Sequence, residues 1–216
     1  MRFFVDTANM EDIQAAFHLG LISGVTTNPV LIHREHTYDI KGQIKKIRQI
    51  CSGEIFTQVL GRSSDEMIAQ AKAIWSWDNN ITVKIPMNTE GVKAVASLSD
   101  MGIRTCATIT YTVAQALAAA VSGASYVALF VNRSNAVGND GFQLVQDVAQ
   151  LYKANAFPTK IVAASIDTPM DVVRVAQAGV DIVTAGYSTW VNLLTNKATD
   201  ETLDSFLADW GGKEIT

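Results

Sequence analysis

The chain has 216 residues, of which 48% are hydrophobic and 18% are charged, and its formal net charge is −4. This supply of apolar side chains is enough to bury a continuous core, which excludes intrinsic disorder. The acidic balance argues against a nucleic acid as partner, which requires a basic face, and no apolar run reaches the roughly 20 residues of a membrane helix.

Eight short apolar runs rich in β-branched residues recur along the chain, and each of them ends in something polar. They cover residues 2–6, 24–28, 55–59, 81–85, 104–108, 126–132, 160–165 and 181–185. Near-continuous apolar runs of this length are typical of strands that are covered on both faces. The sequence therefore predicts eight buried strands.

Ala-rich segments of helical period lie between these runs, for example at 63–77, 92–101, 111–122 and 167–178. Three helices begin with residues that cap helix N-termini, at Ser63, Asn88 and Thr168, and several segments end at a glycine before the next strand. Strand and helix thus alternate about eight times, with about 27 residues for each unit.

This alternation predicts an α/β fold, a (β/α)₈ barrel that spans residues 1–216 as one domain. An additional amphipathic helix is expected at 200–210, after the eighth unit. The structural alternative is an open doubly wound sheet. It would need a glycine-rich phosphate turn after the first strand, and Asp6-Thr7-Ala8-Asn9 is no such turn.

In a barrel of this kind the functional side chains gather where the strands end. A single Thr or Ser at a strand end is more often a helix cap than a catalyst, but here nearly every strand ends in polar residues, which would converge on one mouth. These residues are Asp6, Thr26, Thr27, Asn28, Thr57, Gln58, Lys84, Thr108, Asn132, Arg133 and Ser165.

Lys84 is the most informative of them because it stands between β-branched residues within an apolar strand. One interpretation is a stem that lies along apolar surface with its ammonium group in water. The other is a desolvated amine whose pKa is lowered, and such an amine can attack a carbonyl and form a Schiff base. The residues alone leave both interpretations open.

Three further strand-end residues also have two interpretations each. Asp6 could cap the following helix, or act as general acid and base on hydroxyls beside an iminium. Arg133, which closes the sixth predicted strand, suits bidentate binding of an anionic substrate tail. Ser165 would offer its hydroxyl and helix N-terminal amides to the same anion. A structural pairing is the alternative for Arg133 and Ser165.

His33 and His36 resemble metal ligands in their spacing, but no third ligand follows at a useful distance in the sequence. We expect a solvent-exposed loop there, and neither a metal nor another cofactor. A metal-dependent enzyme that uses these histidines, for which a metal-dependent aldolase would be one example, and a barrel that binds a sugar or another small ligand without catalysis, remain the alternatives to a Schiff-base enzyme.

The N-terminal residues lack the apolar stretch of a signal peptide, and an acidic residue already stands at position 6. Cys51 and Cys106 are too few for a disulfide framework. We therefore expect a cytoplasmic protein.

Several blocks of the sequence resemble the small transaldolase family, which includes fructose-6-phosphate aldolases and short microbial transaldolases. The blocks are FVDTA at 4–8, GVTTNP at 24–29, TVKIP at 82–86, AAS at 163–165 and FLADW at 206–210. The resemblance covers the full chain. It implies a (β/α)₈ barrel that uses a Schiff-base lysine, without metal, to transfer or release a dihydroxyacetone unit from a ketose phosphate such as fructose 6-phosphate. It also implies sugar phosphate and aldehyde substrates, and pentamers or decamers in which the C-terminal helix reaches a neighbour.

The resemblance also assigns roles to the strand-end residues. Lys84 would be the Schiff-base lysine and Asp6 the acid/base, while Gln58 and Thr108 would hold a water that relays protons. The remaining residues would bind the substrate. They are Thr26, Asn28, Phe130, Arg133 and Ser165. Among them, Asn28 would hydrogen-bond hydroxyls of the donor substrate, and Arg133 and Ser165 would bind the phosphate.

Two features depart from the family pattern, the pair at positions 58 and 130 and the residue at position 167. Aldolases of the family usually pair Gln at position 58 with Tyr at position 130, whereas transaldolases pair Glu with Phe; this chain has Gln58 and Phe130. We expect a transferase, because Phe130 lacks the phenol that helps to protonate the enamine, and a lyase is the alternative. Asp167 stands where relatives commonly carry Lys or Arg, which puts the usual preference for phosphorylated substrates in doubt.

Overall fold

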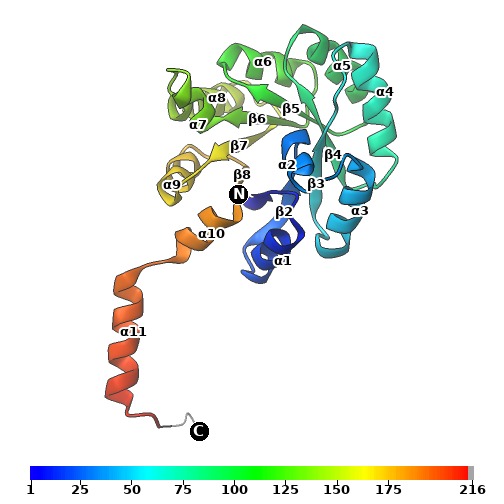
Figure 1. Cartoon of the computed structure of the whole chain (residues 1–216). Coiled ribbons are helices and arrows are strands. Elements are labelled where there is room, and N and C mark those ends of the chain that lie inside the picture. The colour runs from blue at the N-terminus through cyan, green and yellow to red at the C-terminus, as the bar shows by residue number, and fades with distance from the viewer. Residues whose placement is uncertain (214–216) are drawn as a thin grey trace.

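The computed structural model describes residues 1–213. Eight parallel strands close into a barrel in which each strand pairs with its neighbours in the sequence and β1 pairs with β8 (Figure 1). The strands are β1 (Arg2–Asp6), β2 (Ile22–Thr26), β3 (Glu54–Gln58), β4 (Ile81–Pro86), β5 (Thr105–Thr110), β6 (Tyr126–Phe130), β7 (Lys160–Ile166) and β8 (Ile182–Ala185). The predicted (β/α)₈ barrel is confirmed.

Helices follow the strands and surround the barrel. They are α1 (Met10–His18), α2 (Pro29–Arg34), α3 (Ile40–Ile50), α4 (Ser64–Trp75), α5 (Thr89–Asp100), α6 (Val113–Val121), α7 (Val131–Ala136), α8 (Gly141–Ala154), α9 (Pro169–Gln177), α10 (Tyr187–Leu194) and α11 (Lys197–Trp210). The capping residues predicted at Ser63 and Thr168 form capping boxes at the starts of α4 and α9. Gly102, Gly123 and Gly179 have positive φ at the helix ends where a left-handed stop was expected.

Predicted boundaries were wrong at three places that bear on the site. The second strand covers residues 22–26 instead of 24–28, because the side chain of Asn28 accepts two backbone N–H groups and begins α2. That helix extends through Arg34, so the segment expected as a loop is partly helical. The sixth strand ends at Phe130, and Arg133 lies on α7 instead of a strand. An apolar run does not indicate by itself where a strand passes into a helix.

Side chains alternate between two sides of the barrel wall. The residues that point outward pack against the surrounding helices in one large core. The inward-pointing residues form a second, smaller cluster: Phe4, Phe56, Cys106, Tyr126, Ala128, Val162 and Ile182. Because these side chains fill the barrel, a substrate can enter only at one of its ends.

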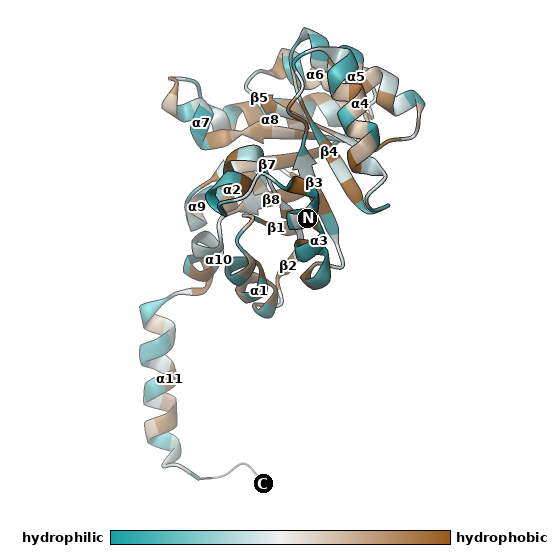
Figure 2. Ribbon diagram, turned by 45° about the vertical axis from the view of Figure 1, so that its right-hand side comes forward, coloured by the Kyte–Doolittle hydropathy of each residue, from teal (hydrophilic) through white to brown (hydrophobic). Residues whose placement is uncertain are grey.

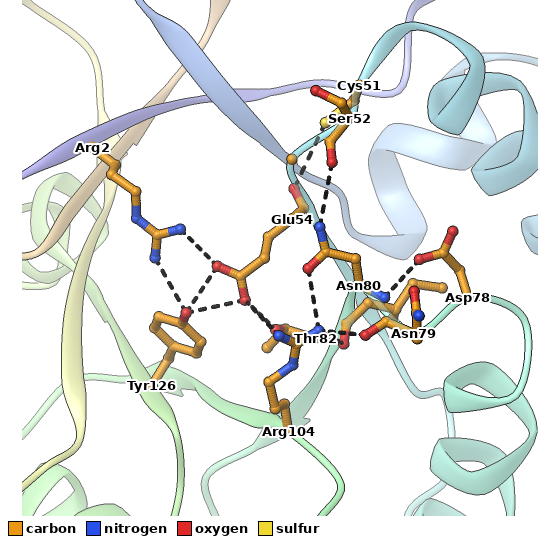
Figure 3. Close-up of polar contacts among 12 residues, drawn as sticks. Arg2, Cys51, Ser52, Glu54, Asp78, Asn79, Asn80, Thr82, Arg104 and Tyr126 are labelled. Atoms are coloured by element: carbon orange, nitrogen blue, oxygen red, sulfur yellow. Dashed lines mark hydrogen bonds and ion pairs between the residues drawn. The ribbon is translucent and has the colours of Figure 1, made fainter.

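Glu54 closes the amino-terminal end of the barrel with a buried polar network (Figure 3). Arg2 Nη1 lies 2.8 Å from its Oε2, the Tyr126 hydroxyl donates to the same oxygen at 2.8 Å, and Thr82 donates to Oε1 at 3.0 Å. Burial alone would raise the pKa of Glu54, but the hydrogen bonds from Arg2 and Tyr126 outweigh it and hold the pKa below its ordinary value. The carboxylate is therefore charged at neutral pH.

The last helix, α11, leaves the barrel and extends away from it (Figures 1 and 2). None of its residues is buried, and four large apolar side chains are 53–67% exposed: Leu203, Phe206, Leu207 and Trp210. The expected additional helix is confirmed, although it begins at Lys197 instead of residue 200. Across the described residues, none of the helices has the length and apolar character to cross a membrane.

We predict that Glu54 makes stability depend on pH in acid. Its folded pKa lies below its unfolded value, so its contribution is complete above the unfolded pKa and is lost as pH falls through the folded pKa. Glu54→Gln should lower the free energy of unfolding by about 2 kcal/mol at pH 7 and flatten its decline in acid. Urea unfolding at several pH values measures both. Glu201→Gln, in an exposed ion pair, is the control and should change the free energy of unfolding little. If the free energy of unfolding of Glu54→Gln declines in acid as steeply as that of the wild type, the prediction is contradicted.

Candidate active site

A cavity of about 320 Å³ opens between the carboxyl ends of the strands and the first turns of the helices that follow them. Seven of the nine residues that the sequence assigned to the site line it: Asp6, Thr26, Asn28, Lys84, Phe130, Arg133 and Ser165. They come from five strands or the segments that directly follow them. The predicted convergence on one mouth is confirmed for these residues.

Lys84 lies on β4 at the bottom of this cavity, with only 6% of its surface exposed. Its Nζ donates a hydrogen bond to the carbonyl oxygen of Thr27 at 2.8 Å. The interpretation in which the ammonium group sits in water is therefore wrong. Burial lowers the pKa of Lys84 below its ordinary value, although the charge of Asp6 acts in the opposite direction. More of the amine is therefore uncharged, and nucleophilic, at neutral pH than in an exposed lysine.

Asp6 ends β1 and points its carboxylate into the cavity. Thr26 donates a hydrogen bond to Asp6 Oδ1 at 2.6 Å, and its hydroxyl also lies 2.6 Å from that of Thr184. The alternative in which Asp6 caps α1 is wrong, because the side chain of Asn9 performs that task. The threonine therefore orients a carboxylate that has no structural task at the helix start.

Asn28 serves two purposes at the mouth. Its Oδ1 accepts the backbone N–H groups of Val30 and Leu31, both at 3.0 Å, and so caps α2. The cap fixes the side chain, and its amide nitrogen is not used by these bonds. Asn28 therefore presents a preoriented donor to the cavity that it lines.

Gln58 and Thr108 do not line the cavity wall, in contrast to the other predicted residues. Gln58, on β3, pairs with Lys84 of β4, and Thr108, on β5, pairs with Pro86 of β4. Because alternate residues of a strand share a face, Thr108 points to the same side as Cys106, which does line the cavity. Thr108 is fully buried, and its hydroxyl has no hydrogen-bond partner among the described residues.

The opposite wall of the cavity carries the groups expected to bind an anion. The guanidinium of Arg133 lies over the ring of Phe130, 4.9 Å from its centre. Ser165 has φ of 57° at the point where the pairing of β7 with β8 shifts its register; such irregularities commonly re-aim a side chain beside a site. Asp167 is exposed and also lines this wall.

Sequence reasoning missed three polar or polarisable residues of the wall, Arg34, Cys106 and Thr184. Thr184 could have been found, because it lies two residues after Ile182 on an apolar strand and so shares its inward face. Arg34 could not, because the sequence does not indicate the direction of the short helix α2. Neither His33 nor His36 lines the cavity, and His33 packs against the ring of Tyr38.

Comparison with known proteins places these observations in a family. The model of the family described as "Transaldolase/Fructose-6-phosphate aldolase" matches residues 3–214. The chain belongs to this family. It is an enzyme of class I aldol chemistry, and sugar phosphates are the substrate class of that family.

Curated relatives match over nearly their whole length. A "Probable transaldolase" of Lactiplantibacillus plantarum is 44% identical over 216 residues, which covers 100% of this chain and 99% of the relative. A "Probable transaldolase 1" of Listeria monocytogenes is 42% identical, with 97% and 98% covered. Among solved structures, a thiamine phosphate pyrophosphorylase from Pyrococcus furiosus has a TM-score of 0.58 at 13% identity, with 85% and 84% covered. That last likeness supports the barrel fold alone.

Proposed function

We propose that the enzyme forms a Schiff base between Lys84 and the C2 carbonyl of a ketose phosphate such as fructose 6-phosphate. The observation that carries this proposal is a buried amine of lowered pKa on the wall of the cavity. The uncharged amine adds to the carbonyl, and the carbinolamine loses water to give an iminium. The Thr27 carbonyl, 2.8 Å from Nζ, orients the amine for this attack.

Asp6 is the acid/base of the carbon–carbon bond-breaking step. Its carboxylate takes the proton of the C4 hydroxyl as the C3–C4 bond breaks, the electron pair moves into the iminium, and an aldehyde leaves. The product on Lys84 is an enamine of dihydroxyacetone. The hydrogen bond from Thr26 supports this role, because it fixes the carboxylate toward the cavity.

The other site residues hold the substrate and move protons. Gln58 and Thr108 hold a water that relays protons between Asp6 and the imine, and the unpartnered Thr108 hydroxyl supports this assignment. The amide of Asn28 bonds the hydroxyls of the donor. Arg133 and Ser165 bind the phosphate.

The fate of the enamine decides between transfer and release. If its C3 attacks an acceptor aldehyde, Asp6 returns its proton to the new hydroxyl, water hydrolyses the regenerated iminium to release the new ketose from Lys84, and the enzyme is a transaldolase. If C3 is protonated and the iminium is hydrolysed, free dihydroxyacetone leaves and the enzyme is a fructose-6-phosphate aldolase. We favour transfer, because Phe130 provides no hydroxyl beside the enamine. Gln58 argues against transfer, because an amide cannot serve as a base. We give Gln58 less weight than Phe130, because the water that Gln58 holds serves both transfer and release.

A homo-oligomer in the cytoplasm is part of the same proposal. The exposed apolar side chains of α11 support packing against a second copy of the chain, in a pentamer or decamer. Two free, buried cysteines support the cytoplasm as location.

Covalent trapping tests the chemistry. Borohydride added together with dihydroxyacetone should reduce the imine and attach a stable adduct to Lys84, which peptide mass spectrometry locates. Lys84→Arg keeps a cation but cannot form the imine, and it should show neither adduct nor turnover of fructose 6-phosphate. An active wild-type enzyme with an unmodified Lys84 peptide would contradict the mechanism.

Phe130→Tyr tests the direction of the reaction. A positioned proton-transfer group contributes about 10²–10⁴-fold to the step that it serves, so the new phenol should raise dihydroxyacetone release from fructose 6-phosphate strongly. Imine trapping at Lys84 should be unchanged, since the phenol acts after the imine forms. A wild-type enzyme that releases dihydroxyacetone freely without an acceptor aldehyde, and does not respond to Phe130→Tyr, is a lyase.

Removal of α11 tests the assembly. Deletion of residues 200–216 should reduce the particle size measured by sedimentation velocity, because it removes the exposed apolar side chains of this helix. Phe206→Ser and Trp210→Ser should have the same effect with the chain length preserved, and Thr202→Ser on the same helix is the control. An unchanged sedimentation profile would contradict the role of α11.

A further inference from the structure

The ring of Phe130 is held between two side chains from different elements. On one side the guanidinium of Arg133, from α7, lies over the ring at 4.9 Å. On another, the ring of Tyr111 meets it edge to face, with 5.7 Å between the centroids and 77° between the planes. Phe130 and Arg133 line the cavity, whereas Tyr111 does not.

The position of Tyr111 depends on an irregularity in β5. Ala107 pairs with Val127, but Thr110 pairs with Leu129, so β5 carries one extra residue between these pairs. Ile109, within the irregularity, has φ of 59°, which is unfavourable for a β-branched residue. The extra residue brings Tyr111, the residue after Thr110, level with Phe130. In regular pairing Thr110 would lie there, and its short side chain could not support the ring.

The side chain of Arg133 stacks on this ring. Its side chain is exposed, and within the described part of the chain no hydrogen bond or ion pair holds its guanidinium. Its backbone is anchored, because the neighbouring Asn132 donates to the Asp171 carboxylate at 2.9 Å. A long side chain loses rotamer freedom when it binds a ligand, and a stacked guanidinium has already lost part of it. Asp167 on the same wall opposes an anion, so an oriented arginine matters more here.

We propose that Phe130 is a positioning residue for Arg133, that Tyr111 holds Phe130 in place, and that the two rings thereby set the affinity for the phosphate of the substrate. This inference rests on the proposed function, in which Arg133 binds that phosphate. Position 130 then has two separable tasks: its ring orients the arginine, and its missing hydroxyl decides the fate of the enamine. The β5 irregularity then supports the phosphate site through Tyr111, which does not itself line the cavity.

Tyr111→Leu tests this inference from outside the cavity wall. It removes the supporting ring, and it should raise KM for fructose 6-phosphate by about two- to fivefold, with kcat unchanged, since exposed cation–π pairs have about that strength. Trapping of dihydroxyacetone on Lys84, which needs no phosphate site, should be unchanged. Tyr111→Phe keeps the ring and should match the wild type. Phe130→Leu, an apolar side chain without a ring, should raise KM in the same way.

A double-mutant cycle separates positioning from general packing. Tyr111→Leu should have no further effect on KM in an Arg133→Gln background. The inference is overturned if Tyr111→Leu still raises KM in the Arg133→Gln background. It is also overturned if Tyr111→Leu weakens dihydroxyacetone trapping as much as it raises KM, or if it leaves KM of the otherwise wild-type enzyme unchanged.

Binding of inorganic phosphate, measured by calorimetry, does not depend on turnover, and it should weaken in Tyr111→Leu and not in Tyr111→Phe. If wild-type Lys84 forms no imine, the proposed function fails, whereas equal phosphate binding by both Tyr111 variants overturns the positioning role by itself.

Discussion

An amine kept out of water at one end of a filled barrel is the constraint on which the rest of the site depends. Lys84 is almost fully buried, and its one hydrogen bond within the described residues is to the backbone carbonyl of Thr27. A buried ammonium is unfavourable unless a carboxylate pairs with it. Asp6 is near enough to influence the pKa of the lysine, yet the ion pairs among the described residues include none between the two. Burial therefore lowers the pKa of Lys84, which agrees with the nucleophilic role proposed for it.

The two ends of the barrel differ in how many hydrogen bonds a buried ionisable side chain receives or donates. At the amino-terminal end, Glu54 is surrounded by donors from Arg2, Tyr126 and Thr82, which keep its carboxylate charged and close the barrel. At the carboxyl end, Lys84 has a single neutral acceptor. The hydrogen-bonded carboxylate closes one end of the barrel and the amine of lowered pKa lines the cavity at the other, which agrees with the general division of (β/α)₈ barrels into a stable and a functional end.

Several residues at the mouth combine a structural task with a place on the cavity wall. Asn28 caps α2 with its oxygen and keeps its amide nitrogen for the cavity. Thr26 joins Asp6 to Thr184 across neighbouring strands. Because a cap or a strand pairing fixes such a side chain before a substrate arrives, less freedom is lost on binding.

The sequence alone determined the barrel, its parallel strands and most of the predicted residues that line the candidate site. Strand and helix alternate with a regular period, and in a parallel barrel all strand ends must meet at one mouth, so residues such as Asp6, Lys84 and Ser165 could be brought together without coordinates. Element ends were less accurate: Arg133 lies on a helix, because a continuous apolar run carries no signal for the point at which a strand passes into α7. Only the tertiary structure decided between a solvated and a buried Lys84, placed Arg34 on the cavity wall, and set Tyr111 against Phe130. Burial, the direction of a short helix and the register of a strand pair depend on contacts between segments far apart in the chain, and local residue patterns do not contain them.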